Sequence, residues 1–224
     1  MKRVILLLAV GCWLLANTNA TAQGVKFGAR AGLNLSKMAM NSGDEDNEAP
    51  ELDNLVGFHV GVVADIKLHD LLYFQPGLMF STKGAKKSES MMGLADYEIS
   101  FNPSYLELPL MLSFKYSFTN DFAVRVNAGP YAAFGLFGKY KMKTTAMGQT
   151  NEDSIDLFTK EEGEDEAMFK RFDAGLGFGG GVEFKQFYLG VNYDLGLTNI
   201  GNNGDNSDAT AKNRTIGISL GYNF

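Results

Sequence analysis

The stretch TIGISLGYNF, residues 215–224, alternates strictly between two kinds of side chain. One set is apolar and consists of Ile216, Ile218, Leu220, Tyr222 and Phe224. The residues between them are glycines or small polar residues. Because successive side chains of a β-strand point to opposite faces, this stretch predicts a strand with one apolar and one polar face. Such a pattern is typical of a strand with lipid on one side and a packed polar interior on the other.

The same alternation recurs along the chain and predicts seven more strands. The predicted strands span residues 24–36, 55–67, 71–84, 104–117, 122–137, 169–184, 187–199 and 215–224. Most of them exceed the roughly 9–11 residues that a tilted strand needs to cross a bilayer. Pro76 and Pro130 fall within two of these strands and each removes a backbone donor, so we expect local bulges there.

The connections between the predicted strands alternate between short turns and long hydrophilic loops. The long connections span residues 37–54, 85–103, 138–168 and 200–212. Short turns on one side and long loops on the other are expected of an outer-membrane barrel. We therefore predict an all-β fold: an eight-stranded antiparallel up-and-down transmembrane β-barrel with short periplasmic turns and long extracellular loops.

The N-terminal residues 1–22 predict a cleaved signal peptide. Lys2 and Arg3 precede an apolar run over residues 4–16, and small residues end the segment with the sequence Ala20-Thr21-Ala22. The run is too short for a transmembrane helix and suits a removable leader. Residues 23–224 are then expected to form one barrel domain.

Composition excludes several classes of function. The chain has 20 basic and 26 acidic residues, a formal net charge of −6, which argues against a nucleic-acid partner. Its one cysteine, Cys12, lies in the predicted leader, so we expect neither a disulfide nor a catalytic thiol. His59 and His69 are not spaced with cysteines for zinc, nor with a nucleophile motif for hydrolysis. We expect no cofactor, no metal site and no enzymatic activity.

Charged residues at predicted inward positions are the candidate site residues. They are Arg30, His59, Asp65, Glu107, Arg125, Arg171, Asp173, Glu183 and Asp194. Side chains fill the interior of an eight-stranded barrel, and buried charges are tolerated there when they are paired. We therefore predict internal ion pairs with a structural role, in preference to a transport path.

Three of the long connections are acidic. They contain the segments GDEDNEAPELD at 43–53, TKEEGEDEA at 159–167 and GDNSD at 204–208. Oxygen-rich loops can bind calcium, but these segments lack the spacing of a dedicated calcium loop. We expect solvated loops that are available for surface binding.

Several segments resemble the PorT-like outer-membrane β-barrel family. The most distinctive are FGARAGLNLS at 27–36, QPGLMFSTKG at 75–84 and YLELPL at 105–110, and the terminal NRTIGISLGYNF at 213–224 continues the match. The resemblance implies an integral barrel in the outer membrane of a Gram-negative bacterium. It also implies that Tyr222 and Phe224 belong to a C-terminal signal read by the barrel-assembly machinery.

These expectations leave three functions open. The first is a monomeric barrel with a filled interior, in contact with outer-membrane lipid, whose role is structural or surface-binding through its acidic loops. The second is an accessory component of a protein secretion or surface-attachment system, with unknown partners. The third is a small-solute channel. A soluble lipid-binding barrel is disfavoured, because its outward face would have to be polar while Leu106, Leu108 and Leu110 are not.

Overall fold

A computed structural model describes residues 25–41, 52–91, 95–146, 149–159, 167–202 and 208–224. The predicted signal peptide, residues 1–22, lies outside the described residues, as does most of each acidic segment. No helix in the described part of the chain is long and apolar enough to cross a membrane.

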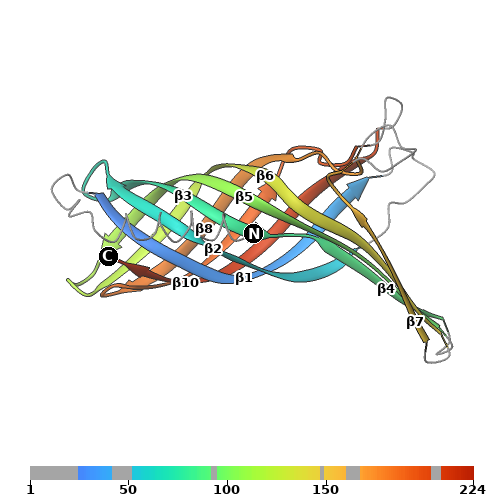
Figure 1. Ribbon diagram of the computed structural model, residues 1–224. Coiled ribbons are helices and arrows are strands. Elements are labelled where there is room, and N and C mark those ends of the chain that lie inside the picture. The colour runs from blue at the N-terminus through green and yellow to red at the C-terminus, as the bar shows by residue number, and fades with distance from the viewer. Residues whose placement is uncertain (1–24, 42–51, 92–94, 147–148, 160–166, 203–207) are drawn as a thin grey trace, which may run out of the picture.

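Antiparallel strands make up nearly all of the described chain. They are β1 (Val25–Asn41), β2 (Asp53–Lys67), β3 (Leu72–Thr82), β4 (Ala85–Met91), β5 (Ala95–Ser117), β6 (Phe122–Ala146), β7 (Gln149–Asp156), β8 (Phe172–Phe184), β9 (Phe187–Gly196) and β10 (Thr210–Asn223). Eight of them pair in a ring in the order β1, β2, β3, β5, β6, β8, β9, β10, and β10 pairs again with β1. The predicted eight-stranded antiparallel barrel is confirmed (Figure 1).

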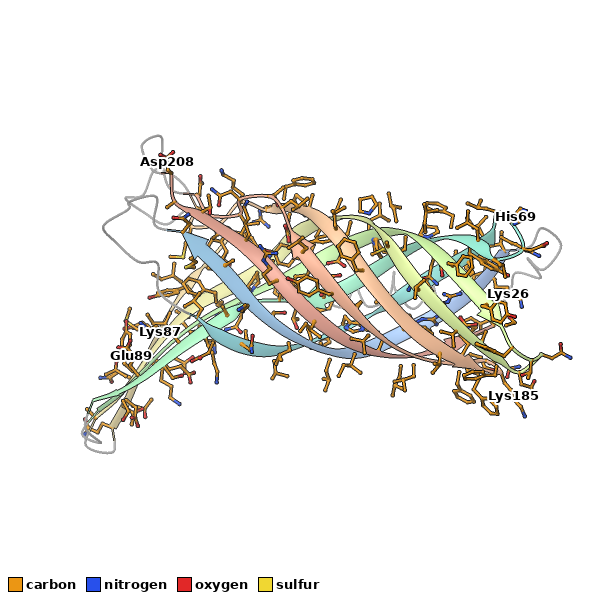
Figure 2. The ribbon with its side chains drawn as sticks, turned by 180° about the vertical axis from the view of Figure 1, so that it is seen from behind. Lys26, His69, Lys87, Glu89, Lys185 and Asp208 are labelled. Atoms are coloured by element: carbon orange, nitrogen blue, oxygen red, sulfur yellow. The ribbon has the colours of Figure 1, made fainter. Side chains whose placement is uncertain are left out.

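The ring has two unlike ends. At the turn end, short turns join β2 to β3, β5 to β6 and β8 to β9, and the C-terminal Phe224 donates its N–H to the carbonyl of Phe27 at 2.8 Å. The long connections lie at the opposite, loop end. Figure 2 places Lys26, His69 and Lys185 at the turn end, and Lys87, Glu89 and Asp208 at the loop end.

Two of the connections predicted as loops contain strands, which corrects the prediction for 85–103 and 138–168. β5 and β6 continue past the ring, β4 pairs with β5, and β7 pairs with β6. We call the sheet formed by β4, residues 95–101, residues 138–146 and β7 the projecting sheet; Figure 1 shows it extending beyond the loop end. The sequence signal was weak there because both faces of these strands carry polar residues.

The predicted bulges at Pro76 and Pro130 are absent. Pro76 pairs with Leu110 and Pro130 with Leu176 without any change of register. A proline removes one N–H donor but adds no residue to the strand, so pairing can weaken locally while the register continues. The register shift lies instead between Ser104 and Tyr105, where the projecting sheet begins.

The barrel is apolar outside and polar inside. Large apolar side chains on the outward faces stay exposed, with Leu33 63%, Val56 68% and Leu220 66% accessible. Inward positions are polar and buried, as at Arg125 and Asp173. This distribution is the reverse of a water-soluble fold and matches a barrel whose outer wall contacts hydrocarbon.

The lipid-facing wall generates a stability prediction. Leu110→Arg, on the outward face of β5, is expected to lower the free energy of unfolding in lipid vesicles by about 2–4 kcal/mol, because it places a charge in hydrocarbon. Leu68→Arg, in the turn between β2 and β3, is the control and should change it little. Urea unfolding followed by gel mobility would measure both. Equal effects of the two variants would contradict a membrane-embedded wall.

Candidate functional site

A cluster of four charged residues fills the turn-end half of the barrel. Arg125 of β6 donates two hydrogen bonds to Asp65 of β2, from Nη2 to Oδ2 at 2.6 Å and from Nη1 to Oδ1 at 3.2 Å. Its Nε lies 3.0 Å from Oε1 of Glu183, and Lys115 pairs with the other oxygen of Glu183. We call Asp65, Lys115, Arg125 and Glu183 the turn-end cluster. Its charges balance, as burial without solvent requires.

Arg30 lies beside this cluster and binds neutral groups. Its guanidinium stacks over the Tyr188 ring, 4.3 Å from the centroid, and Nη2 donates to Oδ1 of Asn223 at 2.7 Å. Gly221 is opposite Arg30 on β10, and a Cβ there would lie 2.5 Å from Cδ of Arg30 and 2.8 Å from the backbone carbonyl oxygen of Ala29. A glycine is therefore required at that position for the arginine to occupy the interior.

A second group of charges lies nearer the loop end. Lys83 directs its Nζ to Oε2 of Glu107 at 2.6 Å and to Oδ2 of Asp194 at 4.0 Å. The same ammonium lies over the Tyr131 ring, 4.4 Å from the centroid. We call Lys83, Glu107 and Asp194 the loop-side cluster.

The remaining four candidates have neutral partners in the described structure, which corrects the prediction that they form ion pairs. Asp173 accepts hydrogen bonds from Thr198 at 2.8 Å and from Asn213 at 2.9 Å. Arg171 donates to the backbone carbonyls of Gly135, Leu136 and Phe158 at the loop end. Amide, hydroxyl and carbonyl groups can satisfy a buried charge as a counter-ion does. The alternation of a strand predicts which side chains point inward, but not whether their partners are charged or neutral.

After Arg30, Asp173 and Arg171, the fourth of these candidates is His59 of β2. Its side chain bridges β1 and β10 through the interior. Its Nδ1 lies 2.7 Å from Oδ1 of Asn34, and its Nε2 lies 2.8 Å from Oγ of Ser219. The order hydroxyl, imidazole, amide resembles that of a nucleophile, a base and an orienting group. However, all three side chains are buried inside the ring. The strands that carry them, β1, β2 and β10, are hydrogen-bonded to one another or to further strands of the ring. The arrangement fits a structural crosslink between strands.

Sequence reasoning missed Lys83 and Lys115 as partners. Lys115 alternates with the outward Phe114 and Tyr116 on β5, so the sequence pattern indicates that its side chain points inward. Lys83 continues the inward set of Gln75 and Ser81 beyond the end of β3. Gly84 follows with a φ of 146°, a conformation that favours glycine, and turns the chain into β4.

A small cavity, lined by both polar and apolar side chains, lies between the two clusters. Its volume is about 110 Å³, and its polar lining includes Asn34, His59, Gln75, Asn192 and Ser219. That volume corresponds to roughly three or four water molecules. In the described residues, no group of three or more histidine, cysteine or acidic side chains is placed to hold a metal ion.

An apolar layer covers the interior at the loop end. It consists of Leu157, Phe158, Phe169 and Ile200, all at most 5% exposed, and we call it the outer cap. Phe158 meets the inward Tyr105 edge to face at 6.0 Å between ring centroids. Backbone hydrogen bonds hold the cap together, including Phe169 N–H to the carbonyl of Leu157 at 2.9 Å. The interior is thus occupied by charged side chains and closed above by packed apolar ones.

The charged interior generates a second prediction. Arg125→Met should destabilise the barrel by about 3–5 kcal/mol, because it leaves the buried carboxylates of Asp65 and Glu183 without their shared partner. Adding Asp65→Asn should recover part of that loss. Lys67→Met, which removes the exposed pair with Asp70, is the matched control and should leave the urea midpoint almost unchanged. An unchanged midpoint for Arg125→Met would contradict the assignment.

One family model matches most of this chain. The family described as "Outer membrane protein beta-barrel domain" matches residues 16–202. The attachment invasion locus protein Ail of Yersinia pestis, solved with the heparin analogue sucrose octasulfate, is 14% identical, with 89% of this chain and 99% of Ail covered and a TM-score of 0.36. OprG from Pseudomonas aeruginosa is 14% identical, with 90% of this chain and 97% of OprG covered and a TM-score of 0.45. Among curated proteins there is no match.

Proposed function

The chain belongs to the outer membrane protein beta-barrel domain family, and on that premise we propose that it is a non-conducting barrel that acts through its extracellular surface. It is an integral protein of the outer membrane of a Gram-negative bacterium. The observation that carries the proposal is the filled interior. The turn-end cluster, the loop-side cluster and the outer cap lie one above another along the barrel, and a cavity of about 110 Å³ lies between the two clusters.

Within the family, we propose that the chain is PorT-like. This finer assignment is supported by the roles of its distinctive segments. In AGLNLS, Asn34 binds His59 and Ser36 binds Thr215 across the interior. In QPGLMFSTKG and YLELPL, Lys83 pairs with Glu107. The segments that carry the resemblance thus contribute part of the polar core, while the turn-end cluster lies outside them.

The surface proposed to act outside the cell comprises the projecting sheet and the acidic loops. One face of the sheet carries half-buried apolar side chains, among them Ile99, Met142 and Ile155. Phe101 on the same face stacks on Phe169 of the outer cap at 5.7 Å, which fixes the base of the sheet to the barrel. The acidic segments 43–53 and 159–167, most of whose residues lie outside the described part of the chain, belong to the connections between strands that end there. A sheet with a partly apolar face suits a binding surface.

The projecting sheet also favours a second candidate function, an accessory role in secretion or surface attachment. A sheet face that is partly apolar and lies outside the barrel offers a partner protein both contact area and strand edges. We propose no catalytic activity, a monomeric state, and an assembly signal in which Tyr222 and Phe224 pack together at 5.4 Å between ring centroids.

The filled interior generates a conductance prediction. Wild-type protein inserted into planar bilayers is expected to give no unitary conductance steps, because charged and apolar side chains occupy the path. A general porin in the same bilayer serves as the positive control, and boiled protein as the negative one. Regular steps that scale with the amount of folded protein would overturn the proposal and support the small-solute channel.

Photo-crosslinking in intact cells would test the surface role. A photoreactive residue at Met142, on the apolar face of the projecting sheet, should form an adduct with a discrete protein. The same residue at Leu189, on the lipid-facing side of β9, is the matched control and should give lipid adducts alone. If positions Met142, Ile99 and Ile155 all yield no protein adduct, the accessory role is wrong.

A further inference from the structure

Three basic side chains gather on the outward wall of β1 and β10, near the loop end. They are Lys37, Lys212 and Arg214, which we call the cationic triad. Each alternates with buried inward residues: Ser36 and Met38 flank Lys37, and Asn213 lies between Lys212 and Arg214. Because side chains alternate between the two faces of a strand, the triad projects away from the barrel interior.

Lys37 and Arg214 are directly opposite each other in the pairing of the two strands. Directly opposed like charges on adjacent strands destabilise a sheet. In the described residues, no ion pair, hydrogen bond or ring contact involves any member of the triad.

Some other exposed cations of this chain have an acidic partner close by. Lys67 pairs with Asp70, and Lys87 pairs with Glu89 at 2.6 Å. On the projecting sheet, Lys141 donates to Glu152 at 3.0 Å and lowers the pKa of that carboxyl. The triad has no such partner among the described residues, and a ligand that supplies negative charge would relieve the repulsion between the directly opposed Lys37 and Arg214.

The position of the triad along the barrel identifies that ligand. The next outward pair towards the turn end is Leu35 with Ile216, followed by Leu33 with Ile218, and these side chains belong to the lipid-facing wall. Tyr193 is opposite Ile216 on β9, at a height where interfacial aromatic residues are expected. The triad therefore lies one row beyond the hydrocarbon boundary, at the level of lipid headgroups of the outer leaflet.

We propose that the cationic triad binds the phosphate groups of an anionic outer-leaflet lipid. The Arg214 guanidinium can bind one phosphate through two parallel hydrogen bonds, and Lys37 and Lys212 supply point charges on either side. A phosphate between Lys37 and Arg214 converts their mutual repulsion into two attractive contacts. The acyl chains of the same lipid then lie along Leu35, Ile216 and the apolar rows below them.

Lipid retention would test the site. The variant Lys37→Gln/Lys212→Gln/Arg214→Gln is compared with wild type after reconstitution with bis-phosphorylated lipid A and extraction into mild detergent, and native mass spectrometry counts the lipid retained. Lys26→Gln/Lys67→Gln/Lys185→Gln, which removes three cations at the turn end, is the matched control. The triad variant should bind on the order of tenfold to a hundredfold more weakly at low salt, and the control should match wild type.

Further experiments distinguish a lipid phosphate from free inorganic phosphate and verify that each variant is folded. Dephosphorylated lipid A should be retained as weakly by wild type as phosphorylated lipid is by the triad variant. Millimolar inorganic phosphate should not displace the lipid, because the acyl chains contribute to binding; displacement would favour a free-anion site and overturn the lipid assignment. A heat-dependent gel shift verifies that each variant is folded. Equal retention by folded triad variant and wild type would refute the proposal, whatever the outcome of the conductance and crosslinking experiments.

Discussion

Backbone hydrogen bonding is the constraint on which the rest of this structure depends. In hydrocarbon there is no water to bind an N–H or C=O group, so a sheet can cross the bilayer only when it has no open edge. The pairing of β1 with β10 meets that requirement, because it joins the first and last described strands of the chain along fourteen residue pairs. Closure in turn fixes the alternation of side chains, with apolar groups towards lipid and polar groups inside.

The enclosed space then determines which interior chemistry is tolerated. Eight strands leave room for side chains but not for a wide aqueous path, so each inward charge needs a partner within the ring. Arg125 satisfies this with two carboxylates, and Asp173 with neutral donors from Thr198 and Asn213. The partners come from strands far apart in sequence, and each pair therefore also holds the curvature of the barrel.

The sequence alone predicted the eight strands of the barrel well. It predicted the contacts of the interior side chains only in part. Period-two alternation is a local signal, so the eight barrel strands could be located from single segments such as 215–224. The projecting sheet was missed because its strands alternate between polar residues and isolated apolar ones such as Ile99 and Met142, with no continuous apolar face. The partners of His59 could not be predicted because they depend on register: Asn34 and Ser219 are 25 and 160 residues away in the chain.

The length of β5 and β6 has a mechanical consequence. These strands, of 23 and 25 residues, each continue from the turn end of the barrel into the projecting sheet, with one shift of register between Ser104 and Tyr105. A load on the tip, pulling away from the cell, acts along the strands and so strains their many interstrand hydrogen bonds in shear, all at once. Sheets resist this direction of pull far better than peeling, in which bonds break one after another. A force on the projecting sheet would therefore be passed along β5 and β6 into the barrel wall.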